Sequence, residues 1–268
     1  MSTTAKPGMR ELLADLAAEQ DELDAVVGRL TEAQWATATP AVGWDVRDQI
    51  AHLALVEEFA RLSVTEPETF AAIEARSAAD PVRFEAELCA RGREMSGAEV
   101  LAMWRRERAA VLAALERFDP AARLAWFGPS MSPMSFLTAR LMETWSHGQD
   151  VVDALGVVRE PTPRLRHIAH LGVKTRGWSH TVHGRPVDPE PVYVELTGPG
   201  GDRWSWGDPQ APHSVRGTAL DFCLVVTQRR HWTATDLQVR GTAAVEWMEI
   251  AQAFAGPPTT TAPDRGRK

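Results

Sequence analysis

The chain lacks the features that mark several large classes of protein. It contains two cysteines, Cys89 and Cys223, which lie far apart and outside any Cys-x-x-Cys pair, so a disulfide framework is not expected. It has no run of about 18 apolar residues, so we predict no membrane span. Residues 1–16 show no basic start followed by an apolar core, and we therefore expect no signal peptide and a cytoplasmic location.

Lysine is scarce as well, and acidic residues outnumber basic ones. Lysine occurs three times, and 36 acidic residues against 29 basic ones give a formal net charge of −7. An acidic chain without a basic cluster argues against a nucleic-acid partner. The expected partner is a small-molecule substrate, and we expect a monomer or a homodimer.

The 268 residues, 44% of them hydrophobic, suit one large domain or two modest ones. In the first half, apolar residues recur at steps of three and four, which predicts amphipathic helices. Residues 66–93 read as helix broken by Pro67 and Pro81. Four long helices are expected, over 8–29, from the N-cap Asp45 onward, from the N-cap Ser96 to about 118, and from Pro133 to Leu155 before the stop at Gly156. These four helices predict a helix bundle.

The second half is mixed. A helix is expected over 163–180, strands in "PVYVELTG" and "RWSWG" joined by a turn, a helix over 215–230, a short strand over 235–241 and a last helix over 242–254. We therefore predict an N-terminal helix bundle over residues 1–157, a small α+β domain over 158–256 and a disordered tail over 257–268. Substrate specificity would come from the second domain and from loops such as 126–136.

The stretch "LMETWSHGQDVV" carries Glu143, His147 and Asp150 within about 60° of one another around the predicted helix. Ser146 falls on the side expected to face solvent. Glu143 and His147 lie at the edge of the buried side, where a charge needs a partner. A Glu and a His four residues apart commonly form a simple hydrogen bond, but they can also reach one cation from successive turns.

His52 lies among apolar residues of the second predicted helix. A single histidine on an apolar face is more often a core residue than a ligand. A bundle readily brings the second and fourth helices together, however, and His52, Glu143 and His147 would then form the two-histidine, one-carboxylate set of open catalytic zinc sites. The same ligands also suit iron, nickel or manganese.

Two segments, "GWDVRDQIAHL" and "ETWSHGQDVVDALG", resemble the mycothiol-dependent maleylpyruvate isomerase family, which belongs to the DinB-like metal-binding four-helix bundles. More weakly, "SVRGTALDFCLVVTQRR" and "LQVRG" resemble that family's sterol-carrier-like C-terminal domain. The resemblance implies a divalent metal, zinc by expectation, held by His52, Glu143 and His147. It also implies a metal-activated thiol, commonly mycothiol, used for cis–trans isomerisation or thiol transfer.

Three further residues enter the predicted site. Asp150 could be an additional ligand, an acceptor for an imidazole N–H, or part of a bundle hydrogen bond, and it is the nearest candidate for a catalytic base. An arginine at the position of Arg229 or Arg230 resembles one proposed to bind a carboxylate of the substrate or thiol. We expect Arg229 to act in catalysis and Arg230 to bind the cofactor thiol, although a solvated helix end is an equally good interpretation.

The leading functional hypothesis is therefore a metal- and thiol-dependent isomerase or transferase. A metal-dependent hydrolase, lyase or cyclase that uses no thiol is the alternative among enzymes. A non-catalytic protein that binds a metal or a small ligand is the alternative from another class.

Overall fold

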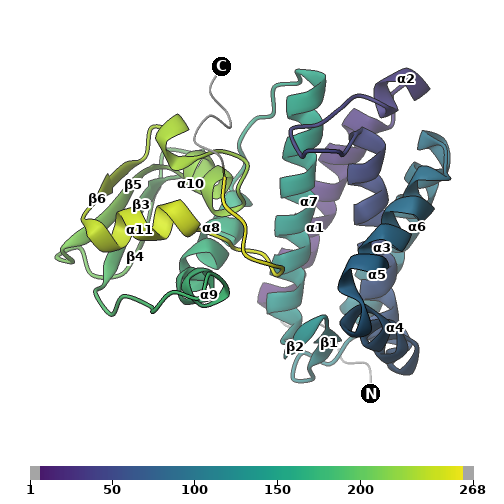
Figure 1. The fold of residues 1–268 in the computed structure, drawn as a ribbon, viewed down its shortest axis with the longest axis horizontal. Helices are drawn as coiled ribbons and strands as arrows, with labels where there is room; N and C mark the ends of the chain where they lie inside the picture. The colour runs from purple at the N-terminus through teal and green to yellow at the C-terminus, as the bar shows by residue number, and fades with distance from the viewer. Residues whose placement is uncertain (1–6, 262–268) are drawn as a thin grey trace. The chain divides into compact units, whose positions relative to one another are not determined.

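The computed structural model describes residues 7–261, and the chain divides into two compact units, residues 1–159 and 160–268. The N-terminal unit is helical, apart from one short hairpin (Figure 1). The C-terminal unit combines a four-stranded sheet with helices. The predicted fold class, a helix bundle followed by a smaller α+β domain, is confirmed.

Four long helices form the N-terminal bundle, and α3 contacts both α6 and α7 while α1 contacts α7 and α6. The predicted break at Pro67 and Pro81 is confirmed, because each proline opens a separate helix. The helices of this unit are α1 (Pro7–Val27), α2 (Glu32–Trp35), α3 (Val46–Thr65), α4 (Pro67–Ala79), α5 (Pro81–Arg93), α6 (Gly97–Glu116) and α7 (Pro133–Leu155).

Local capping fixes where these helices begin and end. Asp45 caps α3 in a reciprocal capping box with Asp48, and Ser96 caps α6 in the same way with Glu99. Such boxes satisfy backbone N–H groups that have no partner within the helix. Gly156 ends α7 in the left-handed conformation, with φ of 64°, which only glycine adopts without strain.

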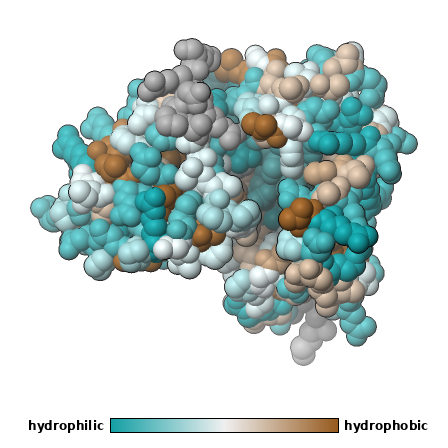
Figure 2. Space-filling model, in the orientation of Figure 1, coloured by the Kyte–Doolittle hydropathy of each residue, from teal (hydrophilic) through white to brown (hydrophobic). Residues whose placement is uncertain are grey.

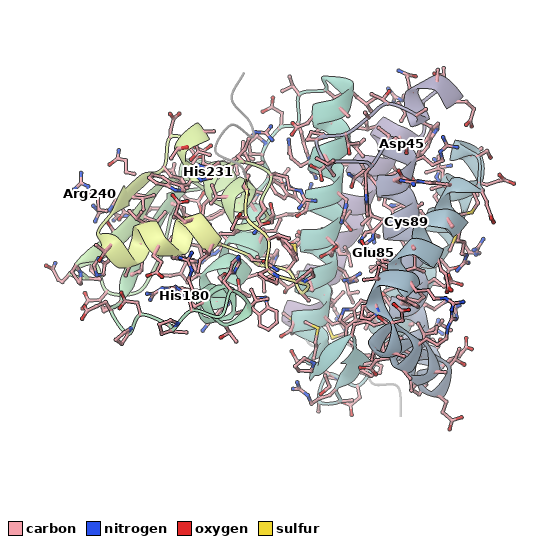
Figure 3. All side chains as sticks on the ribbon, in the orientation of Figure 1. Asp45, Glu85, Cys89, His180, His231 and Arg240 are labelled. Carbon is pink, nitrogen blue, oxygen red and sulfur yellow. The ribbon has the colours of Figure 1, made fainter. Side chains whose placement is uncertain are left out.

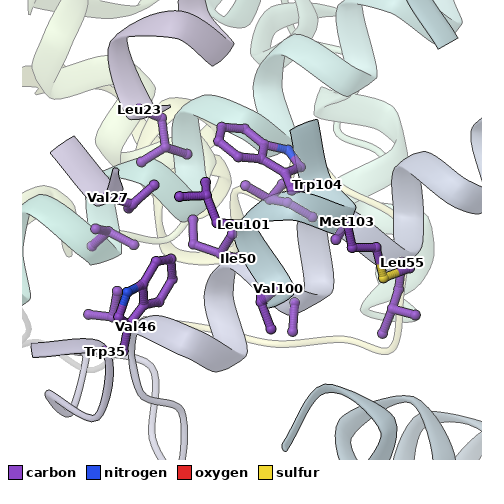
Figure 4. Close-up of a cluster of buried hydrophobic side chains, with 14 residues drawn as sticks. Leu23, Val27, Trp35, Val46, Ile50, Leu55, Val100, Leu101, Met103 and Trp104 are labelled. Atoms are coloured by element: carbon purple, nitrogen blue, oxygen red, sulfur yellow. The ribbon is translucent and has the colours of Figure 1, made fainter. Parts of the chain in front are cut away.

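The bundle core is built from apolar side chains of α1, α3 and α6, together with Trp35 of α2 and Val151 of α7 (Figure 4). Trp104 and Ile50 are fully buried at its centre. Trp35 packs directly on the start of α6, where a Cβ on Gly97 would lie 2.3 Å from the indole ring. A glycine is therefore required at this contact.

Residues 126–136, treated as a loop in the sequence, belong largely to a hairpin of β1 (Leu124–Trp126) and β2 (Gly128–Met131) that leads into α7. Trp126 stacks on the buried Phe70 of α4, with ring centroids 5.6 Å apart. Aromatic packing therefore ties this hairpin to α4.

The C-terminal unit contains a mixed sheet with the strand order β4-β3-β5-β6. Strands β3 and β5 are parallel, and the two outer pairs are antiparallel. Its elements are α8 (Leu165–Lys174), α9 (Arg176–Val182), β3 (Val192–Thr197), β4 (Arg203–Trp206), β5 (His213–Thr218), α10 (Ala219–Val226), a 3₁₀ turn (Trp232–Ala234), β6 (Gln238–Arg240) and α11 (Thr242–Ile250).

Three predictions in this unit were wrong in detail. The segment 215–230 is not one helix, because its first residues form β5 and pair with β3, and α10 begins only after the N-cap Thr218. The helix expected over 163–180 is two helices separated at Thr175. The last helix ends at Ile250 rather than at 254.

The tail predicted to be disordered, 257–268, lies only partly within the described residues. Thr259 accepts a hydrogen bond from Gln228 through its backbone carbonyl and donates one to that residue through its hydroxyl. Its backbone N–H donates to Gln252. Thr259 is therefore hydrogen-bonded to the C-terminal unit, and 262–268 lie outside the described residues.

On the face of the molecule drawn in Figure 2, hydrophilic side chains predominate and apolar ones form scattered spots. Within residues 7–261, no helix has the length and apolar content needed to cross a bilayer.

Candidate metal centre

Three potential metal ligands from two helices meet in the N-terminal unit. His52 comes from α3, and Glu143 and His147 come from successive turns of α7. Glu143 Oε2 lies 3.6 Å from His52 Nε2 and 3.3 Å from His147 Nε2, and the two imidazole centroids are 4.4 Å apart. The structure thus brings together the three residues that the sequence singled out.

The spacing of the donor atoms fits a divalent cation. One ligand atom from each residue lies within 4.8 Å of the others. Tetrahedral ligands at about 2.0–2.1 Å from a zinc ion are about 3.3 Å from one another, close to both distances measured from Glu143. Three protein ligands leave at least one coordination position for a substrate or a water molecule.

Glu143 is held in its charged form. Burial by itself would raise the pKa of its carboxyl group. Hydrogen bonds to His147 and His52 and the charge of Arg140 outweigh that effect, and the pKa lies well below its ordinary value. A carboxylate that stays ionised between two imidazoles is suited to a cation.

A chain of hydrogen bonds sets the orientation of His147. The hydroxyl of Thr39 donates to the carbonyl of Trp44, at 2.9 Å, so it accepts the bond from the Gln49 side-chain amide, also 2.9 Å. The Gln49 oxygen is then directed at His147 Nδ1, 2.5 Å away, and that nitrogen must carry the proton. The lone pair of a neutral His147 is therefore on Nε2, the atom facing Glu143.

An aromatic side chain covers the two histidines. The ring of Trp44 is stacked over His147 at a centroid distance of 5.9 Å and is tilted against His52 at 5.4 Å. The His147 side chain keeps 14% of its surface exposed and that of His52 keeps 32%. The cluster is therefore partly shielded from water yet open on the His52 side.

Two buried charged side chains, Arg140 and Glu57, interact electrostatically with Glu143. The guanidinium of Arg140 sits over the ring of Trp126, with its carbon 4.7 Å from the ring centroid. Glu57 is buried and accepts a hydrogen bond from Gln20 at 3.4 Å. Burial raises the pKa of Glu57 to about 7, although the charge of Arg140 and this hydrogen bond act in the opposite direction.

Asp150 and Ser146 lie elsewhere on α7. Asp150 is 1% exposed and is not one of the clustered residues, so the structure gives no support for it as a ligand. Ser146, expected to face solvent, is 2% exposed. The prediction that this side chain faces solvent is therefore wrong.

Arg229 and Arg230 belong to the C-terminal unit, where they follow α10 rather than closing it. The helix ends at Val226, and both arginines donate backbone N–H bonds to the carbonyl of Leu224. Gln228, with φ of 60°, makes the turn between them and the helix. Their predicted roles remain predictions.

Gln49 and Trp44 belong to this site but were not predicted from the sequence. Gln49 lies three residues before His52, on the same side of α3, and it is fully buried. A polar residue at this spacing from a suspected ligand is a signal that could have found it. Arg140 lies at the same spacing before Glu143 and carries the same signal, whereas Glu57 lies at no such spacing from a suspected ligand.

Two family models and two curated proteins are similar to this chain. A family model described as the mycothiol maleylpyruvate isomerase N-terminal domain matches residues 16–152, and one described as wyosine base formation matches residues 188–239. Two proteins of Mycobacterium tuberculosis, called uncharacterized proteins MT0041 and Rv0036c, are each 47% identical over 254 residues, covering 95% of this chain and 98% of their own.

The fold also matches solved structures. The crystal structure of the mycothiol-dependent maleylpyruvate isomerase has a TM-score of 0.57 at 16% identity, and a histidine-to-alanine mutant of it has a TM-score of 0.55. Each match covers 82% of this chain and 89% of the other, and at this identity it shows the shared fold. The family model spans more than half of the chain and contains all three clustered residues. The chain therefore belongs to the family of the mycothiol maleylpyruvate isomerase N-terminal domain.

Proposed function

We propose that this protein is an enzyme that uses a divalent metal ion to activate a thiol. The metal is expected to be zinc, and the activated thiol is used for isomerisation or thiol transfer on a small organic substrate. The observation that carries the proposal is the convergence of His52, Glu143 and His147 in a chain of this family. A divalent metal bound there would stabilise a thiolate at neutral pH. Mycothiol is the proposed thiol.

The residues around the cluster have separable roles in this proposal. Glu143 supplies the negative charge, and the two neutral imidazoles supply nitrogen lone pairs. Gln49 keeps the proton of His147 on Nδ1. Trp44 holds both rings from one side. Together they keep three ligand atoms in place before the thiol arrives, which lowers the cost of ordering the site.

Arg229 and Arg230 are proposed to bind carboxylate groups of the thiol or the substrate, since a guanidinium forms paired hydrogen bonds with a carboxylate. Asp150 is proposed to form a hydrogen bond within the bundle rather than to bind the metal. The hydrolase, lyase or cyclase alternative needs a base near the metal, and Asp150 does not join the cluster. The cytoplasmic location remains a prediction.

Isothermal titration of mycothiol into zinc-loaded and metal-free protein tests the proposal. We expect binding to the zinc-loaded protein, with release of the thiol proton, and binding at least tenfold weaker to the metal-free protein. The Glu143→Gln variant should behave like the metal-free protein. Equal binding to both forms would refute thiol activation by the metal.

A further inference from the structure

An apolar cavity of about 170 Å³ lies within the N-terminal unit, beside the cluster of His52, Glu143 and His147. Helices α3 and α5 form its walls, and Trp44 closes one end. Its apolar lining includes Ala51, Leu55 and Leu88. An engineered protein cavity of about 150 Å³ holds one benzene molecule, so this cavity has room for one six-membered ring or a short branched chain.

The cavity reaches the cluster through two shared side chains. The ring of His52 is part of its wall, and Trp44, which lies against both histidines, is another. A group held in the cavity therefore contacts the ring of a metal ligand.

The charges around the cavity are negative. Glu85 of α5 lies at its edge, and Asp48 is already neutralised by two hydrogen bonds of 3.0 Å from Arg93. The lining contains no arginine or lysine, and all of its residues belong to the described part of the chain. In the metal-free protein, a carboxylate placed here would lose its hydration without gaining a cation and would be repelled by Glu85.

The walls are closely spaced and chemically inert. A Cβ on Gly92 would lie 2.7 Å from that of Ala51, so α3 and α5 meet at this point and limit the cavity. Cys89, one turn after Glu85 on α5 (Figure 3), contributes a half-buried thiol. Burial, followed by the charge of Glu85, raises the pKa of this thiol, so at neutral pH it is an uncharged part of the wall.

We infer that this cavity binds an uncharged apolar group of the substrate, of the size of one aromatic ring or a short branched acyl chain, and that it rejects a carboxylate at this position. That the bound group belongs to a substrate rests on the proposed function. The selectivity of the cavity rests on its lining alone, so the two can be tested separately.

Cys89 provides a reporter for the test, because Cys223 is fully buried. The metal-free protein is alkylated with iodoacetamide at pH 8.5 in the presence of benzyl alcohol or benzoate, which differ chiefly in charge. Mass spectrometry of the peptide containing Cys89 gives the rate. We expect benzyl alcohol to slow the alkylation and benzoate to need at least a tenfold higher concentration for the same protection.

A charge-reversal variant makes the test specific. Glu85→Lys changes an exposed side chain at the cavity edge, and we expect it to improve protection by benzoate at least fivefold. The control Ala86→Lys places a lysine at the next exposed position of α5, outside the lining; it changes the charge by one unit rather than two, and it should leave the preference unchanged. Equal protection by both ligands, or none by either, would overturn the inference.

The assay requires no thiol and no turnover. If mycothiol fails to bind through the metal but benzyl alcohol protects Cys89, the proposed function falls and the cavity assignment stands. If mycothiol binds and benzyl alcohol gives no protection, the cavity assignment falls alone.

Discussion

Replacing Gln49 with leucine should weaken metal binding although Gln49 touches no metal. The substitution removes the acceptor for His147 Nδ1–H and the donor to Thr39. A neutral His147 can then move its proton to Nε2, where it blocks the ligand position. Partners of this kind are typically worth 10–100-fold in metal affinity, or about 1.4–2.7 kcal/mol. We expect zinc affinity to fall within this range.

The assay is competition with a chromophoric chelator for zinc at pH 7.5. Gln49→Glu keeps an acceptor facing His147 and should retain or exceed the original affinity. Thr39→Val leaves the Gln49 oxygen in place but removes its orienting partner, so the loss should be smaller than with Gln49→Leu. Denaturant unfolding of the metal-free proteins separates lost stability from lost affinity. A folded Gln49→Leu protein with the original affinity would refute the hydrogen-bond argument.

Three further predictions concern other parts of the N-terminal unit. The folded-state pKa of Glu57 is raised from 4.5 to about 7, so between these pH values the folded state holds a proton that the unfolded state has lost. The free energy of unfolding of the metal-free protein should therefore fall by about 3 kcal/mol as pH rises from 4.5 to about 7. Glu57→Gln should remove most of this pH dependence in urea titrations, and an unchanged pH dependence would contradict the assignment. Gly97→Ala should lower the free energy of unfolding by about 1–3 kcal/mol, because the new Cβ would overlap the Trp35 ring. Gly8→Ala is the control, since Gly8 has open space around it, and it should not destabilise the protein in the same thermal scans. Equal effects of the two substitutions would argue against the contact between Gly97 and Trp35. Asp150→Asn should leave zinc stoichiometry and affinity within about threefold of the original, since a ligand would be worth far more, and loss of the metal would restore Asp150 to the ligand set.

The bundle could be predicted because its determinants are local. The capping boxes at Asp45 and Ser96 and the stop at Gly156 lie within a few residues of the helix ends they fix. Periodicity then identified the long helices. The segment 215–230 failed for the opposite reason. Its first residues become a strand only by pairing with β3, about twenty residues earlier, and its apolar content suits helix and buried strand alike.

The metal ligands could be proposed from the sequence because two of them are one helical turn apart on α7. The resemblance to the family then pointed to His52 on α3. The residues that surround and orient these ligands were harder to predict from the sequence. Gln49 acts through Thr39 and Trp44, which precede α3 in an irregular segment whose path no periodicity predicts. The burial of Ser146 likewise depends on packing that the sequence of α7 alone does not reveal.

The central claim is that His52, Glu143 and His147 hold one divalent metal ion. The most direct test is zinc titration of metal-free protein followed by calorimetry, with elemental analysis after dialysis. We predict one equivalent of tightly bound zinc in the unmodified protein and none retained in the His52→Ala, Glu143→Gln and His147→Ala variants, each folded by circular dichroism. One equivalent of zinc retained with unchanged affinity in any of these variants would contradict the account.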